Sequence, residues 1–390
     1  MPFDFIIVGA GLAGITAAEE LANVMNKKVL ILEKRDHIGG NCYDFINENG
    51  TRINKYGPHI FHTDNNLVYN YLSLFTMWDR HSHKILFKCD DTMVPVPFNF
   101  ISIDKILPKE AEEIKSALLD KYDVKSKIPI KELVESENKH IKKLGDTIYE
   151  IFSKHLKKVY NINDNEIIEF IDKLLPFRTS YDCRYYENVY QAIPREGYTN
   201  MFNNMLSNHN ITVMLNTDYH DIIKIDHKNK KIYFEDEEFE GHLIFTGMID
   251  EFFEYKFGKL PYRSSILINE IIENDTFQDN AVIYYPEEYH FSRITDYKYL
   301  CGDYLESTTI QLEYPVEYDV TSEEENVPFY CLPLEKNKEI FKKYRKLSEE
   351  YENITFIGRL TEYETLQMDE VVEKVLKLIS EKFTGLSTEY

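Results

Sequence analysis

A glycine-rich stretch near the start of the chain has the residues and spacing of a phosphate-binding turn. The segment FIIVGAGLAGITAAEEL spans residues 5–21 and places glycines at positions 9, 11 and 14. Gly9 permits a tight turn, Gly11 lets the backbone approach a pyrophosphate, and Gly14 lets the following helix pack against the strand. The helix N-terminus then offers free N–H groups and a positive dipole end to the phosphates. The pattern predicts a dinucleotide site.

An acidic residue follows at the spacing that such a site requires. The segment VLILEKR reads as a second buried strand, and it ends at Glu33. A carboxylate at this point suits a free ribose 2′-hydroxyl, which makes a 2′-phosphorylated cofactor a poor fit. Gly39 and Gly40 in EKRDHIGGNCYD would bring a second stretch of backbone close to the same pyrophosphate.

Two histidines have a spacing that raises the question of a metal. His59 and His62 stand in YGPHIFHT with two residues between them. We expect no metal there, because no third ligand is in sight and the apolar neighbours indicate a strand rather than the helix of HExxH proteins. His81, His83 and His140 are expected at the surface.

Composition limits the partners. The 390 residues include 45 Lys plus Arg against 67 Asp plus Glu, a net charge of -22. This balance opposes nucleic acid or an anionic membrane as a partner, and an anionic substrate would have to be held by a few well-placed arginines. The five cysteines form no CxxC pair, which suits a reducing compartment. No apolar run is long enough for a membrane span, so a cytoplasmic protein is expected.

The order of predicted elements indicates an α/β protein that returns twice to its first domain. Strand, helix and strand open the chain, charged segments with apolar residues at helical spacing follow, and strand-like alternation comes after them. A Rossmann-like nucleotide-binding domain is therefore expected to be interrupted by a helical insertion and an antiparallel sheet domain. The expected parts of the nucleotide-binding domain are 1–90, 201–250 and 340–390; the helical insertion is 100–177; the sheet-domain parts are 178–200 and 255–335.

Several motifs in a fixed order resemble the flavin-dependent UDP-galactopyranose mutases. They are GAGLAG, YGPHIFHT, FRTSYD followed by YQAIPREGYTNMF, TGMIDEFF, SRITDYK, and GRL followed by MD. The resemblance covers nearly the whole chain and implies that the dinucleotide is FAD. Family members contract a nucleotide-linked pyranose to its furanose without net redox change. Reduced FAD acts there through N5, which attacks the anomeric carbon.

The resemblance also implies roles for single residues. Arg178 and Arg293 match the two arginines that clamp the diphosphate, Tyr330 matches a tyrosine that donates its hydroxyl to it, and His62 lies in the run beside the flavin. Substrate contacts are expected from Tyr160, His155, Tyr190, His59, Arg263, Tyr363 and Thr365. Cofactor contacts are expected from Gly9, Gly11, Gly14, Glu33, Lys34, Gly39, Gly40, Asn41, His59, Gly247, Gly358, Arg359, Met368 and Asp369.

The chain departs from the family where the nucleotide sugar should bind. His155, Leu156, Val159 and Tyr160 replace the tyrosine, threonine, glutamine and tryptophan of a run that contacts uracil. In GRLTEYETLQMD, Thr365 stands where the second family tyrosine is expected, and Gln367 stands where the first aspartate is expected. Unmatched buried polar groups cost about 1–3 kcal/mol each, so such changes alter selectivity. The nucleotide is thus predicted to be UDP, GDP or dTDP, carrying a hexose, deoxyhexose or heptose.

Two other classes of function share parts of the pattern. An amine-oxidase-like FAD oxidoreductase would have the same glycine turn, but it would not call for the pair of arginines. A non-catalytic flavin- or nucleotide-binding protein is the third reading. Family precedent favours a homodimer.

Overall fold

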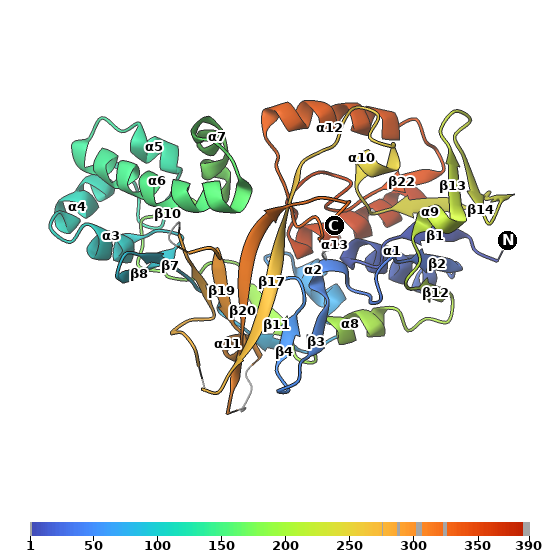
Figure 1. Cartoon of the computed structure of the whole chain (residues 1–390), viewed down its shortest axis with the longest axis horizontal. Helices are drawn as coiled ribbons and strands as arrows, with labels where there is room; N and C mark the ends of the chain where they lie inside the picture. The colour runs from blue at the N-terminus through green and yellow to red at the C-terminus, as the bar shows by residue number, and fades with distance from the viewer. Residues whose placement is uncertain (1, 275, 287–288, 302–305, 323–325, 385–390) are drawn as a thin grey trace.

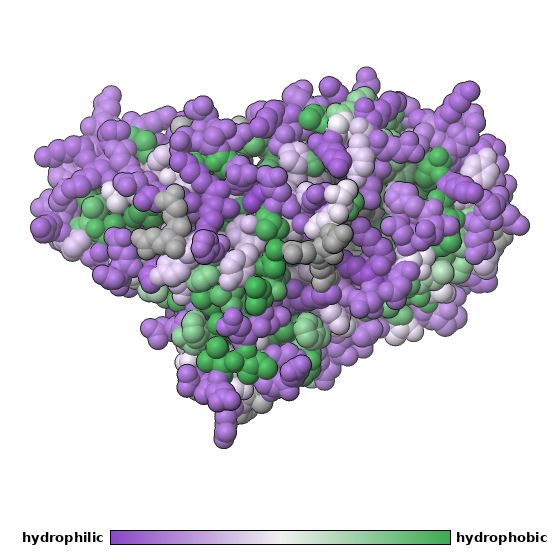
Figure 2. All heavy atoms as spheres, in the orientation of Figure 1, coloured by the Kyte–Doolittle hydropathy of each residue, from purple (hydrophilic) through white to green (hydrophobic). Residues whose placement is uncertain are grey.

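The computed structural model describes residues 2–274, 276–286, 289–301, 306–322 and 326–384. Figure 1 shows a helical group at one end, a parallel sheet flanked by helices at the other, and long strands between and below them. Hydrophilic side chains cover most of the face drawn in Figure 2, in keeping with the acid-rich composition. Within the described part of the chain, no helix is both long and apolar enough to cross a membrane.

Five parallel strands form the sheet behind the glycine-rich turn, in the order β12-β2-β1-β16-β22. Their bounds are β1 Phe5–Val8, β2 Val29–Leu32, β12 Ile211–Met214, β16 His242–Phe245 and β22 Ile354–Phe356. Strands β1 and β2 are buried along their length because other elements cover both faces. The carboxyl ends of parallel strands meet at one edge, where ligands bind in such sheets.

Helices cover one face of this sheet, and a mixed layer covers the other. On the first face, α1 (Leu12–Asn23) packs against α13 (Met368–Ile379) and α8 (Tyr198–Met205). The other face carries α10 (Ile249–Phe252), α12 (Glu335–Ser348) and the small sheet β13 (Ile223–Asp226), β14 (Lys231–Phe234) and β15 (Glu237–Glu238). The alternate residues of β1 therefore belong to two separate apolar cores.

The predicted helical insertion is present. It consists of α3 (Phe100–Ile106), α4 (Ala111–Lys121), α5 (Ile130–Val134), α6 (Lys139–Tyr160) and α7 (Asp164–Leu174), with the strand pair β9 (Lys127–Ile128) and β10 (Phe177–Arg178). The Asn138 side chain caps the start of α6 by accepting from the backbone N–H groups of His140 and Ile141. Asn161 ends the helix in the left-handed conformation, with φ of 52°.

The second large sheet has seven strands in the order β21-β17-β20-β19-β18-β7-β8. Its bounds are β7 Ile85–Cys89, β8 Thr92–Val96, β17 Tyr262–Ile272, β18 Val282–Tyr284, β19 Arg293–Asp296, β20 Thr308–Glu317 and β21 Tyr330–Cys331. The strands pair antiparallel except β18 with β7, which pair parallel. The sheet therefore takes two strands from the region of residues 85–96, whereas the sequence grouped residues up to 90 with the first domain.

A second difference concerns residues 178–200, which the sequence assigned to the large sheet. Strand β11 (Tyr190–Pro194) pairs instead with β5 (Phe61–Thr63) and β6 (Trp78–Arg80) in a three-stranded sheet. This pairing buries Phe61 against Trp78, whose rings stack at 4.8 Å. The remaining elements are β3 Asp44–Ile46, β4 Arg52–Asn54, α2 Asn66–Leu72, α9 Tyr219–Ile222, α11 Lys298–Cys301, and the short helices Gly40–Cys42 and Ser380–Thr384.

Candidate functional site

A first cavity lies at the carboxyl ends of β1, β2 and β16, in front of the N-terminus of α1. Twelve of the fourteen predicted cofactor residues line it: Gly9, Gly11, Glu33, Lys34, Gly39, Gly40, Asn41, His59, Gly247, Gly358, Arg359 and Met368. Gly14 and Asp369 do not line the cavity. Residues from four separate stretches of the chain thus form one pocket.

The glycines of the turn are required by close contacts. Gly9 has a φ of 101°, and a Cβ atom there would lie 2.3 Å from Thr246 Oγ1. A Cβ atom at Gly14 would lie 2.0 Å from the carbonyl oxygen of Gly9, so Gly14 is the point where α1 packs onto the turn. One at Gly40 would lie 2.9 Å from the Cα of Gly11. These contacts leave the first N–H groups of α1 facing the cavity.

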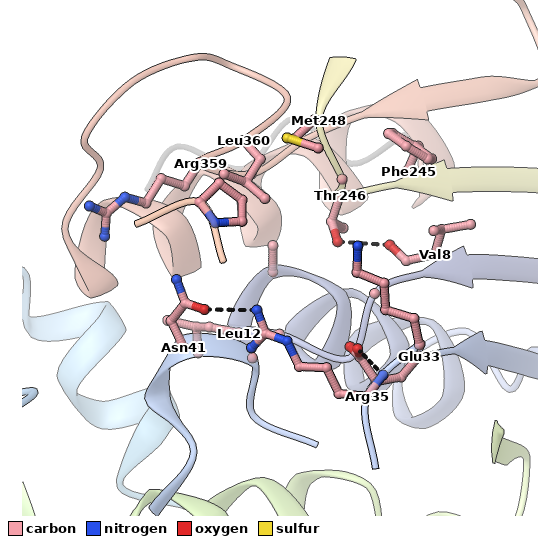
Figure 3. Close-up of a pocket in the computed structure, with 18 of the residues that line it drawn as sticks. Val8, Leu12, Glu33, Arg35, Asn41, Phe245, Thr246, Met248, Arg359 and Leu360 are labelled. Carbon is pink, nitrogen blue, oxygen red and sulfur yellow. Dashed lines mark hydrogen bonds between the residues drawn. The ribbon is translucent and has the colours of Figure 1, made fainter. Parts of the chain in front are cut away.

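Charged side chains stand around the turn, as Figure 3 shows. The Glu33 carboxylate accepts from the backbone N–H groups of Ala10, at 2.8 Å, and Arg35, at 3.0 Å. The Arg35 guanidinium donates to Asn41 Oδ1 at 3.1 Å and lies 4.5 Å from the centre of the Tyr56 ring. Its Nη1 is buried without a hydrogen-bond partner among the described residues. A pocket with an open helix N-terminus and an unpaired guanidinium N–H fits a dinucleotide diphosphate.

A second cavity of about 940 Å³ adjoins the first and is bounded by α6, the seven-stranded sheet and the start of α13. Asn41, His59, Arg359, Leu366 and Met368 line both cavities. The second cavity also contains these predicted site residues: His155, Tyr160, Arg293, Tyr330, Tyr363 and Thr365. The two cavities therefore meet at residues that include His59 and Arg359.

Arg293 is the buried cation of the second cavity. It stands at the start of β19 and forms an ion pair with Glu313 of β20, whose Oε1 also accepts from Ser265 at 3.0 Å. Burial alone would lower the pKa of Arg293, but Glu313 and nearby tyrosines hold the pKa above its usual value. Tyr330 also lines this cavity, and the centre of its ring lies 5.8 Å from the Arg359 guanidinium carbon. Burial raises the pKa of the Tyr330 hydroxyl. The hydroxyl thus stays protonated and can donate.

His59 is a neutral imidazole at the junction of the cavities. Its Nδ1 lies 2.8 Å from the carbonyl oxygen of Gly57, to which it donates. Burial, together with Arg359 and Arg293, lowers the pKa of His59 to about 4. Its Nε2 is therefore a hydrogen-bond acceptor at neutral pH. Within the described ranges, no group of three or more His, Cys, Asp or Glu side chains could hold a metal ion.

The far end of the second cavity is aromatic. His155 of α6 stacks on Tyr284 at 4.9 Å, and burial lowers the pKa of this histidine to about 3. Its Nδ1 is buried and has no hydrogen-bond partner among the described residues. Tyr160, at the end of α6, packs edge-on against Tyr330 at 6.0 Å. Flat rings and one unpaired acceptor suit a nucleobase better than a bare sugar.

Four of the residues predicted to be catalytic or to bind substrate line neither cavity. Arg178 is buried, and it donates through Nη1 to the carbonyl of Arg184 at 2.6 Å and through Nη2 to that of Tyr185 at 2.9 Å. Both Nη atoms of the Arg178 guanidinium thus bond to the backbone of the loop that contains it. Arg263 lines a separate cavity, where Nε donates to the Val159 carbonyl at 3.0 Å.

Tyr190 and His62 are the other two. Tyr190 stacks on Tyr69 at 3.9 Å, and its hydroxyl donates to Asn66 Oδ1 at 2.7 Å. His62 is buried behind Tyr186, whose ring is 3.6 Å away. Neither residue faces a cavity because each is covered by the chain that packs on it.

Other residues of the second cavity were not expected from the sequence. Tyr185, Tyr186, Tyr284 and Glu313 line it, and so does His83, which was expected at the surface but is buried. Burial lowers the pKa of His83 to about 3. The signal for Tyr185 and Tyr186 was present in the aromatic run RYYENVY, a composition unusual for an exposed loop.

Known proteins resemble this chain in sequence over most of its length. The sequence model of the family described as UDP-galactopyranose mutase matches residues 150–365, and that of an NAD(P)-binding Rossmann-like domain matches residues 7–75. The chain is 32% identical to a UDP-galactopyranose mutase of Mycoplasma genitalium, over 95% of this chain and 92% of the relative. It is 31% identical to a dTDP-fucopyranose mutase of Escherichia coli, over 95% of this chain and 96% of the relative.

The other matches are shorter in sequence or are likenesses of fold. A flavin-containing amine oxidase A of Sus scrofa is 35% identical, but over only 17% of this chain and 12% of that protein. Among solved structures, a reduced UDP-galactopyranose mutase superposes with a TM-score of 0.74 at 16% identity, covering 99% of this chain and 95% of the other. An engineered putrescine oxidase gives 0.59 at 12% identity, covering 98% and 99%. Full-length similarity at the sequence level joins this chain to the mutases, and it is an enzyme of the UDP-galactopyranose mutase family.

Proposed function

We propose that this enzyme interconverts the pyranose and furanose forms of a nucleoside-diphosphate sugar with reduced FAD as its cofactor. The observation that supports the proposal best is the meeting of the two cavities at His59 and Arg359. A cofactor in the first cavity would reach a substrate in the second only there. The full-length relatives act on UDP-galactopyranose and dTDP-fucopyranose, both nucleotide sugars.

Residues of the two cavities would have separate roles in this reaction. Reduced FAD, held by the glycine turn, Glu33 and Arg35, would supply a nucleophilic nitrogen for the anomeric carbon. Arg293 would balance the charge of the departing diphosphate, with Arg359 as a second cation and Tyr330 as a hydroxyl donor. The neutral His59 would accept a hydrogen bond at the junction. The reaction is an isomerisation, so no electron acceptor is consumed.

The aromatic end of the cavity supports a pyrimidine nucleotide as the carrier. Phe152, His155 and Tyr284 pack together there, and the unpaired Nδ1 of His155 would accept the imide N–H of uracil or thymine. Cytosine presents an acceptor in place of that N–H. We therefore favour UDP or dTDP over CDP.

The test is conversion of a panel of UDP- and dTDP-hexopyranoses and deoxyhexopyranoses by the dithionite-reduced protein, followed by chromatography of pyranose and furanose forms. Conversion by reduced but not by oxidised protein, with loss of activity in Arg293→Ala, is the expected result. Peroxide release from amines with no sugar conversion would favour the amine-oxidase reading. Nucleotide binding without conversion in either redox state would favour a non-catalytic protein.

A further inference from the structure

The aromatic end of the second cavity continues into an apolar wall. Leu156 and Val159 of α6 form one side of this wall. Ile85 of β7, Val96 of β8 and Val282 of β18 form the other side. These three are neighbours in the sheet, because Ile85 pairs with Val96 on one flank and with Val282 on the other. The wall is therefore built from five side chains that offer no hydrogen bond.

Polar side chains at this end of the cavity are few. Within α6, β7, β8 and β18, all of which the structure describes, the polar residues that line the cavity are His155, Tyr160 and Tyr284. The Tyr284 side chain already hydrogen-bonds to Tyr185. Tyr160 packs edge-on against Tyr330 and against Phe170. A ligand that needs many hydrogen bonds is thus poorly served here.

His155 offers one acceptor. Its ring hydrogen-bonds to the backbone of Tyr285, whose N–H group donates to the Ser292 carbonyl, so His155 donates to the carbonyl oxygen of Tyr285. The donating nitrogen is Nε2, because Nδ1 has no partner among the described residues. In the neutral imidazole Nδ1 then carries no proton and accepts. The matching group on a base is an imide N–H, which thymine and uracil both have.

The sheet sets how far the apolar wall lies from the diphosphate, and this step rests on the proposed function. Arg293 of β19 pairs with Tyr284 of β18, and β7 is the next strand. Neighbouring strands are about 4.8 Å apart, so Ile85 lies roughly 10 Å from β19 across the sheet. A nucleoside spans a comparable length. With its diphosphate at Arg293, a base would therefore lie against Val282 and Ile85.

Thymine matches these surroundings better than uracil does. Both bases have the imide N–H that Nδ1 of His155 would accept, and thymine adds a methyl group at C5. We propose that the apolar wall holds this methyl group, and that the sugar is carried by thymidine diphosphate (dTDP) rather than by UDP. Leu156 and Val159 are then specificity-determining residues, and Arg293 and the cofactor remain with the reacting atoms.

Binding of two nucleotides to the full-length, FAD-loaded protein tests the proposal without turnover. Deoxyuridine diphosphate (dUDP) differs from dTDP only in lacking the C5 methyl group, so titration calorimetry of the two isolates the effect of that group. We expect dTDP to bind about fourfold more tightly, the factor that burial of one methyl group gives. Equal affinities, or tighter binding of dUDP, would overturn the proposal and leave the mutase function standing. Binding of neither nucleotide would refute both.

Variants at Leu156 test where the methyl group lies. Leu156→Thr adds a hydroxyl group to the wall, whereas Leu156→Met keeps the wall apolar at similar volume and is the matched control. We expect the fourfold preference for dTDP to disappear in Leu156→Thr and to persist in Leu156→Met. Val159→Thr, a change of similar shape at a half-buried position, makes the same test if Leu156→Thr does not fold. A preference that survives both threonine variants would reject the assignment of the methyl group to this wall.

Discussion

The Arg293–Glu313 ion pair lies in the second cavity, and under the proposed function Arg293 would have both a catalytic and a structural role. Arg293→Ala should lower turnover by several orders of magnitude, and it should also leave the buried Glu313 carboxylate unpaired, at a cost of about 3–5 kcal/mol in stability. The double variant Arg293→Ala/Glu313→Gln should recover most of the stability but none of the turnover. Urea unfolding measured beside the conversion assay separates the two effects. Equal stability of single and double variants would show that the pair does not hold the fold.

Arg178 has a different character, although the resemblance gives it the same role. Its two bonds to backbone carbonyls predict that Arg178→Ala destabilises the protein by about 3–6 kcal/mol, since each bond from a charged donor contributes about 1.5–3 kcal/mol. Arg178→Lys should restore little, because an ammonium group cannot form the fork. Chemical denaturation checks this prediction. Unchanged stability with lost turnover would return Arg178 to the diphosphate clamp.

At the scale of residues, the sequence predicted types and regions better than orientations. Gly9, Glu33 and Arg359 line the first cavity as expected, because local spacing along one turn or strand determines their direction. Arg178 and His62 lie in the expected region but turn away from the cavities. Arg178 bonds to backbone carbonyls of its own loop, and His62 contacts Asn188, which is distant in sequence, so spacing along the chain does not show either orientation. His83 was misplaced because a single histidine carries no periodic signal of burial.

At the scale of elements, α1 packs closely on the turn before it at Gly14. Replacing a helical glycine by alanine ordinarily stabilises a helix by about 1 kcal/mol. Gly14→Ala should do the opposite, because its methyl group would meet the Gly9 carbonyl at 2.0 Å. We expect a lower unfolding midpoint and weaker flavin retention after gel filtration. A gain in stability would mean that α1 can shift away from β1 at low cost.

The elements themselves were predicted with uneven success. Apolar runs predict buried parallel strands, and apolar residues at helical spacing predict amphipathic helices. The α/β fold and the helical insertion, which were predicted from these patterns, are confirmed. The pairing partners of β7, β8 and β11 were not predicted. These short strands have similar composition, and their neighbours in the sheets are chosen by contacts between distant segments.

At the scale of the whole molecule, buried neutral histidines predict sensitivity to acid. Burial lowers the pKa of His83 and of His155 to about 3, below the usual value of an unfolded histidine. The unfolded chain therefore binds more protons below about pH 6.5, and stability falls as the pH falls through that value. Each of the two imidazoles should cost about 2 kcal/mol at pH 5.

Unfolding free energies at pH 7.5 and pH 5 check this expectation. The difference between the two should shrink by about 2 kcal/mol in His155→Phe, a variant that keeps an aromatic ring beside Tyr284. An unchanged difference would show that other groups dominate the acid response.

The strand order of the parallel sheet has a consequence for folding during translation. Strand β22 and the adjoining Gly358 and Arg359 complete a pocket begun by β1, so the ribosome must translate some 350 residues before the cofactor has a place to bind. At about 5–20 residues per second, this takes on the order of 20–70 s. During that interval the nascent chain has an incomplete cofactor pocket. A product that ends before β22 should therefore bind no flavin and stay colourless. Flavin colour thus reports that translation has reached the last helix.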